Sequence, residues 1–235
     1  AEVVSWYSEK GDFEKALALG EEALKRNPRY VDLHLMVGAL YLNMRDYKKA
    51  AAEYEKAVEL DQKNLAAHLY LALIYAAENR NDRAETHFRK MLAIDPENVT
   101  GIYYYGKLLA DMKKNKEAET MYQKVLSLRP HFGPAVSDLA DLYEKQGKIG
   151  KAIELYRDYG DRSPDRLNVK LRIAELLTRQ KNYKEAIKEY QDYLQMDPEN
   201  REARLRLGIL YYDLRRYEDA ASQFSWMLQK NSADD

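Results

Sequence analysis

Four histidines are the side chains in this sequence that could support metal chemistry, namely His34, His68, His87 and His131. His34 and His68 are separated by 34 residues, and in a repeating structure this interval would bring them near each other. A zinc site needs three or four ligands, most often from Cys and His. The sequence has no Cys, and no third ligand accompanies the two histidines. We therefore predict no metal site and no cofactor.

Carboxylates could act as general acids or bases, and adjacent pairs such as Glu21–Glu22 occur. Charged residues make up 33% of the chain, so such pairs are expected on solvated surfaces. The sequence contains no Gly-rich phosphate loop, no nucleophile elbow and no HExxH zinc motif. Because a catalytic function has to be argued from a site, these residues predict that the protein is not an enzyme.

The composition is typical of a soluble, mostly helical protein, because Gly (10) and Pro (6) are scarce while Tyr (20) is abundant. The net charge of −1 provides no global field that would attract nucleic acid or an anionic membrane. No apolar run is long enough to cross a bilayer. We predict no nucleic-acid partner and no membrane insertion, and the composition leaves both cytoplasm and periplasm open.

The elements that position these side chains follow a repeat of 34 residues. Alanine recurs at this interval without insertion or deletion, at Ala16, Ala50, Ala84, Ala118, Ala152, Ala186 and Ala220. Other positions carry a second small residue, as at Gly38 and Ala72, or an aromatic ring, as at Tyr54 and Phe88. A terminal proline recurs at Pro28, Pro96, Pro130, Pro164 and Pro198. A fixed period of this length indicates stacked copies of one supersecondary unit.

The apolar spacing within a unit predicts two amphipathic helices. In the second unit, residues 31–44 place Leu33, Val37 and Leu40 three or four positions apart, and a second helix follows around Ala50. Small residues let the two backbones approach, and large rings fill the remaining volume. One hairpin cannot bury its apolar face alone, so its stability must come from stacking on neighbours. We predict an all-α fold.

The period predicts a single array over residues 1–235. Its approximate repeats are 1–30 (partial), 31–64, 65–98, 99–132, 133–166, 167–200 and 201–235. No extra polar helix covers either end, and Trp226, Met227 and Leu228 lie in the last helix. Because open arrays generally need a solvating cap, we expect a fragment of a longer protein or ends that another chain covers.

These residues resemble the tetratricopeptide repeat family in the period, the small-residue positions and the terminal proline, over essentially the whole chain. A pentatricopeptide array would have a period of 35 residues, and the alanines show no such drift. Local departures are Gly20 at an aromatic position, and Gln62 and Ser232 in place of the terminal proline. The resemblance implies a TPR-type α-solenoid, a right-handed superhelix of antiparallel helix hairpins whose first helices line the concave side.

Helical spacing places a set of side chains on the side of the first helices that faces the concave groove. In the second to fourth repeats these residues are mostly apolar: Met36, Leu42, Tyr70, Leu73, Tyr103, Tyr104 and, at one position, Lys107. In the later repeats they are charged, as at Asp141, Arg172 and Arg206. We predict that these ten residues bind a partner, because an apolar surface rimmed by charge is typical of protein binding. The alternative is that Leu35, Leu69 and Tyr103 only pack against the next hairpin.

Chaperone-binding members of the family resemble one another in a clamp of Lys, Asn and Arg that holds a partner's terminal carboxylate. The positions that would carry Asn hold Ala39, Leu73, Lys107, Asp141, Glu175 and Ile209 in this chain. The resemblance therefore does not extend to the clamp.

We predict a protein–protein interaction scaffold that binds a protein or peptide segment in the concave groove. Two alternatives remain open. One is a structural assembly module that self-associates through its uncapped terminal repeats. The other is the recruiting domain of a larger enzyme whose catalytic part lies outside this sequence.

Overall fold

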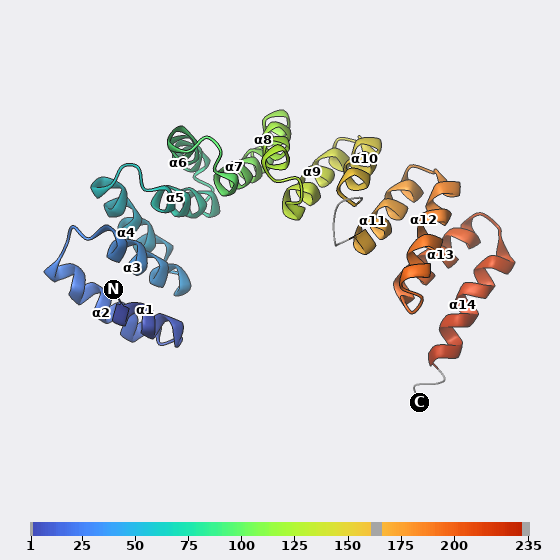
Figure 1. Cartoon of the computed structure of the whole chain (residues 1–235), viewed down its shortest axis with the longest axis horizontal. Helices are drawn as coiled ribbons and strands as arrows, with labels where there is room; N and C mark the ends of the chain where they lie inside the picture. Colours follow the sequence, from blue (N-terminus) through green and yellow to red (C-terminus); the bar gives the residue numbers. More distant parts are fainter. Residues whose placement is uncertain (1, 161–165, 232–235) are drawn as a thin grey trace. The chain divides into compact units, whose positions relative to one another are not determined.

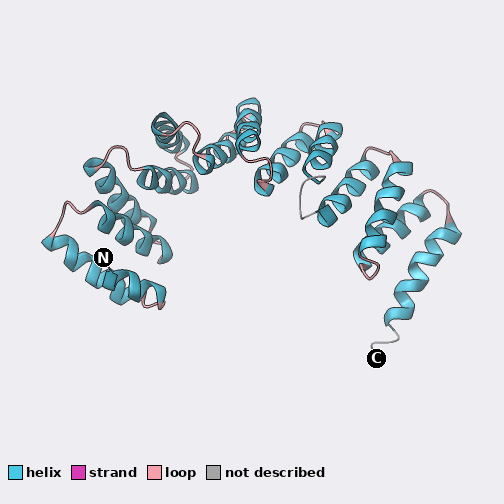
Figure 2. Ribbon diagram, viewed as in Figure 1, coloured by secondary structure: helices cyan, strands magenta, loops and turns pink. Residues whose placement is uncertain are grey.

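The computed structural model describes residues 2–160 and 166–231, and within them every regular element is a helix (Figures 1 and 2). The chain divides into two compact units, with the boundary between Leu128 and Arg129. The terminal residues Pro164 and Ser232 of two repeats lie outside the described residues.

In the first unit the helices form four antiparallel pairs. Their bounds are α1 (Glu2–Glu9), α2 (Phe13–Arg26), α3 (Val31–Asn43), α4 (Tyr47–Leu60), α5 (Leu65–Ala77), α6 (Asn81–Ile94), α7 (Val99–Asp111) and α8 (Asn115–Leu128). In the second unit they form three pairs: α9 (Gly133–Lys145), α10 (Ile149–Gly160), α11 (Arg166–Arg179), α12 (Tyr183–Met196), α13 (Arg201–Asp213) and α14 (Tyr217–Asn231). Each unit is thus a stack of hairpins, which confirms the predicted α-solenoid fold.

A left-handed residue ends the first helix of every hairpin. Two of these residues are glycines, Gly11 and Gly147, with φ of 79° and 73°. The same position in the other five hairpins carries a residue with a side chain at φ of 58–63°, namely Arg45, Asn79, Lys113, Lys181 and Arg215. The amide of the next residue then donates back across the turn, as from Asp46 to the Tyr41 carbonyl at 2.9 Å. This left-handed turn is the usual way for a helix to satisfy its last carbonyls.

Side-chain caps begin several of the helices. The carboxylate of Asp46 accepts from the amide of Lys49 at 3.1 Å before α4, and that of Asp12 does the same before α2. Before the first helices of three hairpins, Asn64, Asn98 and Asn200 accept from an amide three residues later at 2.9–3.0 Å. These caps satisfy amides that the helix leaves without a partner.

The core has the predicted complementarity of small residues and rings. The repeated alanines at position Ala16 and its equivalents are all 0–2% exposed. A Cβ atom at Gly38 would lie 2.9 Å from the ring of Tyr54, and one at Gly208 would lie 2.5 Å from the ring of Phe224. The glycines therefore let the ring of the second helix lie directly against the first helix.

Tyrosine hydroxyls join successive hairpins. Tyr41 donates to the carboxylate of Glu21, and Tyr75 donates to that of Glu55, in each case on the second helix of the preceding hairpin. In the second unit the hydroxyl of Tyr211 accepts from Gln191 at 3.0 Å across the same interval of 20 residues. These contacts explain part of the abundance of tyrosine. Each of these rings is buried, and its hydroxyl has a hydrogen-bond partner in the neighbouring hairpin.

Candidate functional site

The first helices of three hairpins in the first unit carry few charges on any side. Helix α5 has no Asp, Glu, Lys or Arg, α3 has only Asp32, and α7 has only Lys107 and Asp111. A helix that is apolar all round is expected to be covered all round. We call the predicted residues on these helices the aromatic face: Met36, Leu42, Tyr70, Leu73, Tyr103, Tyr104 and Lys107.

Tyr70 is the most exposed of the large apolar side chains on the aromatic face, at 37%. Its ring stacks on that of Tyr54, with centroids 5.0 Å apart and an interplanar angle of 16°. Met36, Leu42 and Leu73 are half-buried, and Met36 packs against the core between the first two hairpins. Packing against the core thus holds the aromatic face in place, while part of its apolar surface remains exposed.

Tyr103 and Tyr104 continue the aromatic face onto α7. Both rings are half-buried and their centroids lie 5.2 Å apart. Tyr103 also contacts the ring of Tyr122 at 6.2 Å, and the Lys107 ammonium lies 5.7 Å from the Tyr103 ring centroid. Leu35 and Leu69 are likewise half-buried. For these two residues and for Tyr103, packing therefore covers part of the side chain and leaves the rest accessible.

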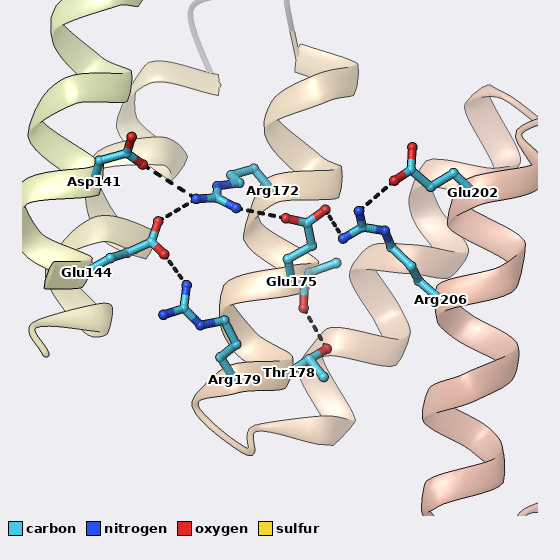
Figure 3. A network of polar contacts seen from close by, with 9 residues as sticks. Asp141, Glu144, Arg172, Glu175, Thr178, Arg179, Glu202 and Arg206 are labelled. Carbon is cyan, nitrogen blue, oxygen red and sulfur yellow. Dashed lines mark hydrogen bonds and ion pairs between the residues drawn. The ribbon is translucent and has the colours of Figure 1, made fainter.

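The charged candidates of the second unit bind one another. The guanidinium of Arg172 donates to Glu144 at 2.7 Å and to Glu175 at 2.9 Å, and lies 3.5 Å from Asp141 (Figure 3). Arg179 also pairs with Glu144, and Arg206 joins Glu175 to Glu202. We call these seven residues, Asp141, Glu144, Arg172, Glu175, Arg179, Glu202 and Arg206, the ion-pair network.

The ion-pair network connects the first helices of its three hairpins, α9, α11 and α13 (Figure 3). Burial opposes the charge of Arg172, but the hydrogen bond to Glu175 and the charge of Glu144 raise its pKa above the ordinary value. For Arg206, the hydrogen bond to Glu202 raises the pKa. Because its four carboxylates and three guanidinium groups largely neutralise one another, the network presents little net charge to a partner.

Three of the four histidines, His34, His68 and His87, have structural partners. The Nε2 atoms of His34 and His68 face the carbonyls of Pro28 and Gln62 at 3.0 and 3.1 Å. The Nδ1 atom of His34 lies 2.7 Å from Glu53, and that of His68 lies 3.0 Å from Nδ1 of His87. The sequence did not indicate the contact with His87. Within the described residues, no group of three or more His, Asp or Glu side chains has the arrangement of a metal site.

An exposed apolar row on α13 was missed by the sequence interpretation. Leu205, Ile209 and Tyr212 are 41%, 46% and 60% exposed, and their spacing of four and three residues places them on one side of the helix. Leu171, which precedes Leu205 by one repeat, is half-buried. The helical spacing of these three apolar residues is a signal in the sequence that is sufficient to find this row.

Comparison with known families gives a consistent match. Two family models, both described as tetratricopeptide repeat, match residues 7–63 and 35–99, and residues 75–127, 109–176 and 177–226. No curated protein matches the sequence. Among the described residues, no helix has the length and apolar character required to cross a membrane.

Solved structures share the fold. The C-terminal part of a TPR repeat-containing protein from Cytophaga hutchinsonii aligns with a TM-score of 0.79 and 13% identity, covering 95% of this chain and 92% of that one. A tetratricopeptide repeat protein from Parabacteroides merdae aligns with a TM-score of 0.66 and 18% identity, over 95% and 89%. YrrB, described as a TPR protein with an unusual peptide-binding site, aligns with a TM-score of 0.59 and 18% identity, over 78% and 95%.

Proposed function

Because this chain belongs to the tetratricopeptide repeat family, whose repeats form scaffolds for protein–protein interaction, we propose that it binds a partner segment on its aromatic face. Proteins of this family are generally scaffolds rather than enzymes, and we propose that this chain has no catalytic activity of its own. The peptide-binding site named for YrrB is a property of that protein, and it makes a peptide the first partner class to test here.

The observation that carries the proposal is the contrast between the two sets of candidate residues. Tyr70 and Tyr104 leave aromatic surface open on helices that have almost no charge. Arg172 and Arg206, in contrast, already bind the carboxylates around them. Aromatic side chains supply much of the energy in protein interfaces because they bury a large area at low entropic cost. We therefore assign the anchoring of the partner to the aromatic face.

The proposed partner is not held by a terminal carboxylate. Where the chaperone-binding clamp would need Asn on successive first helices, this chain has Leu73, Lys107 and Asp141. Lys107 provides one cation on the aromatic face, and it lies against Tyr103. Recognition would rest on apolar contacts along the partner segment.

The test is a selection of peptides from a random library displayed on phage, followed by affinity measurements on the double variant Tyr70→Ala/Tyr104→Ala. We expect the variant to lose binding at least about tenfold, because each ring contributes more than about 1 kcal/mol in an anchoring position. The matched control is Tyr30→Ala/Tyr47→Ala, which removes two rings of the same unit that are 39% and 44% exposed outside the aromatic face. Equal affinity of the double variant and the wild type would refute the proposed location.

A second candidate function is self-association through the last hairpin, and the exposed row on α13 is the observation that favours it. Leu205, Ile209 and Tyr212 form an apolar patch of the kind that marks protein contacts. Sedimentation over a range of protein concentrations tests this function. A concentration-dependent dimer that Ile209→Asp/Tyr212→Asp abolishes would support a second copy of the chain as the occupant, and a monomer at all concentrations would exclude it.

A further inference from the structure

The hydroxyl of Tyr54 is buried without a hydrogen-bond partner among the described residues. Tyr54 belongs to α4, and its side chain is 0% exposed. The far end of its ring reaches α3, where it covers Gly38, and its face stacks on Tyr70 of α5. The hydroxyl therefore lies between two first helices, directly beneath an exposed ring of the aromatic face. An unpaired buried hydroxyl costs about 1–3 kcal/mol, so its presence needs an explanation.

The equivalent tyrosines of the second unit have partners. The hydroxyl of Tyr156 forms a hydrogen bond with Arg172. The hydroxyl of Tyr190 has Thr178 and Arg206 as partners. Tyr70 occupies the same repeat position as these two arginines, three repeats before Arg172 and four repeats before Arg206. The second hairpin thus keeps the tyrosine of the second helix, and an aromatic ring, Tyr70, takes the place of its polar partner.

We propose that the Tyr54 hydroxyl donates a hydrogen bond to a backbone carbonyl of an uncharged, extended partner segment, and that Tyr70 turns aside to admit it. The inference rests on the function proposed above and deepens it by naming the chemistry of the segment. It identifies Tyr54 as a binding residue, and Tyr70 as the ring that covers its hydroxyl in the free protein and packs against the segment once it is bound.

The surroundings of Tyr54 favour a neutral acceptor. The arginines of the second unit are partly buried, and each is paired with carboxylates, Arg172 with Glu144 and Glu175, and Arg206 with Glu175 and Glu202. Around Tyr54, the corresponding positions on α3 are Ala39 and Leu42, and α5 has no carboxylate. A Lys or Arg of the partner would therefore be desolvated without a counter-charge, which costs several kcal/mol.

The acceptor belongs to an extended segment rather than to a helix. Within an α-helix the backbone carbonyls are occupied by amides four residues later, so a docked helix offers none to Tyr54. An extended chain has free carbonyls and places successive side chains on opposite sides. Apolar side chains on one side would then contact Met36, Leu42 and Leu73, which are half-buried.

The first experiment compares Tyr54→Phe with the wild type, using the peptides selected from the random library. We expect binding to weaken by about threefold to tenfold, the value of one hydrogen bond between neutral groups. We also expect the free variant to unfold at the same or a higher temperature than the wild type, because an unpaired hydroxyl has been removed. A purely structural role cannot give weaker binding together with equal or higher stability. Phe88 occupies the equivalent position one hairpin later, so a phenylalanine is compatible with this packing.

Tyr190→Phe is the matched control, since it removes a hydroxyl with partners in the second unit. We expect it to leave peptide binding unchanged and to lower the unfolding temperature. If Tyr54→Phe binds the peptides as tightly as the wild type, the inference is wrong. The double variant Tyr70→Ala/Tyr104→Ala then decides whether the function proposed above is also wrong. If this variant loses binding, the aromatic face still binds the partner; if it binds normally, both proposals are wrong.

A second experiment identifies the acceptor. Peptides in which one amide at a time is replaced by an ester have a weaker carbonyl acceptor at a known position. We expect one such replacement to reduce binding to the wild type but not to Tyr54→Phe, because the two changes remove the same hydrogen bond. Additive effects at every position would show that no peptide carbonyl contacts Tyr54 and would overturn the assignment.

Discussion

Arg172 is the residue through which most of the ion-pair network is connected, since it contacts carboxylates on its own helix and on α9. Its side chain is 35% exposed, while that of Glu144 is only 8% exposed. Loss of the guanidinium would leave Glu144 with Arg179 alone and would remove one of the two polar partners of the Tyr156 hydroxyl. The energy of this contact should lie between that of a surface pair and that of a fully buried one.

We therefore expect Arg172→Met to lower the free energy of unfolding by about 1–2 kcal/mol, measured by urea denaturation. The matched control is Arg157→Met, because Arg157 pairs with Glu185 at 2.8 Å but both side chains are about half exposed, at 48% and 51%. The control should change stability very little. Equal effects of the two substitutions would show that the network is no stronger than an ordinary surface pair.

The lowered pKa of His87 leads us to expect that the stability of the protein depends on pH. Burial, with the nearby charges of His68, Lys90 and Arg83, lowers its pKa from 6.5 to about 4. Between these two values the unfolded chain binds a proton that the folded chain does not, so stability falls as the pH is lowered from 6.5 and this loss is complete below about 4. Burial also lowers the pKa of His68, which acts in the same direction.

Urea denaturation at a series of pH values checks this expectation. The variant His87→Gln should lose less stability than the wild type between neutral pH and about pH 4, because it has no proton to take up there. Carboxylates contribute to the acid response of both proteins, so the difference between them is the quantity to compare. Parallel curves for the two proteins would contradict the lowered pKa of His87.

At the scale of the element, the turns within the hairpins have a residual strain that can be relieved. Lys113 has a φ of 62°, a conformation that costs a residue with a side chain roughly 1 kcal/mol and costs Gly nothing. Gly147 occupies the same position in the next hairpin, at a φ of 73° and with no heavy atom near the place of a Cβ. The left-handed conformation of this turn is therefore unstrained at Gly147 and strained at Lys113.

We expect Lys113→Gly to raise the free energy of unfolding by a few tenths to about 1 kcal/mol, since relief of strain exceeds the entropy that Gly gains in the unfolded chain. The reverse substitution, Gly147→Ala, should lower it by about 1 kcal/mol. Thermal and urea denaturation of both variants measure the effects. A Gly at position 113 that destabilises the protein would mean that the lysine side chain makes a compensating contact.

At the scale of the whole molecule, the chain has almost no net charge, −1, and the aromatic face contains a single cation. Attraction between exposed charges is screened by salt, whereas burial of apolar surface is not weakened by it. Binding to the aromatic face should therefore respond to salt differently from binding to a charged surface.

We expect the affinity for the selected peptides to change by less than about twofold between low salt and about 0.5 M NaCl. Fluorescence anisotropy of a labelled peptide measures this. A peptide carrying several acidic residues, tested in parallel, provides a reference for charge-driven binding. If the affinity for the selected peptides fell steeply with salt, the partner site would have to lie at charged residues and not at the aromatic face.

The fold and the register of its elements could be predicted from the sequence alone. The alanines from Ala16 to Ala220 fix the period, because only a small residue fits where two helix backbones approach closely. The spacing of apolar residues within 31–44 predicts a helix that the structure places at Val31–Asn43. The spacing within a helix is a local signal, because it depends on residues only three or four positions apart, and the period repeats that signal in every hairpin.

The state of the candidate side chains was decided by tertiary structure. Asp141, Arg172 and Arg206 appear in the sequence as a charged surface, but their partners lie about one repeat away and become visible only when the hairpins stack. Tyr54 and Tyr190 share one repeated position, yet one hydroxyl is unpaired and the other bonded, because the side chain that reaches it comes from the next hairpin. The sequence determines which residues face the neighbouring helix. Only the packed structure decides which atoms meet there, because a hydrogen bond requires contact within about 3 Å.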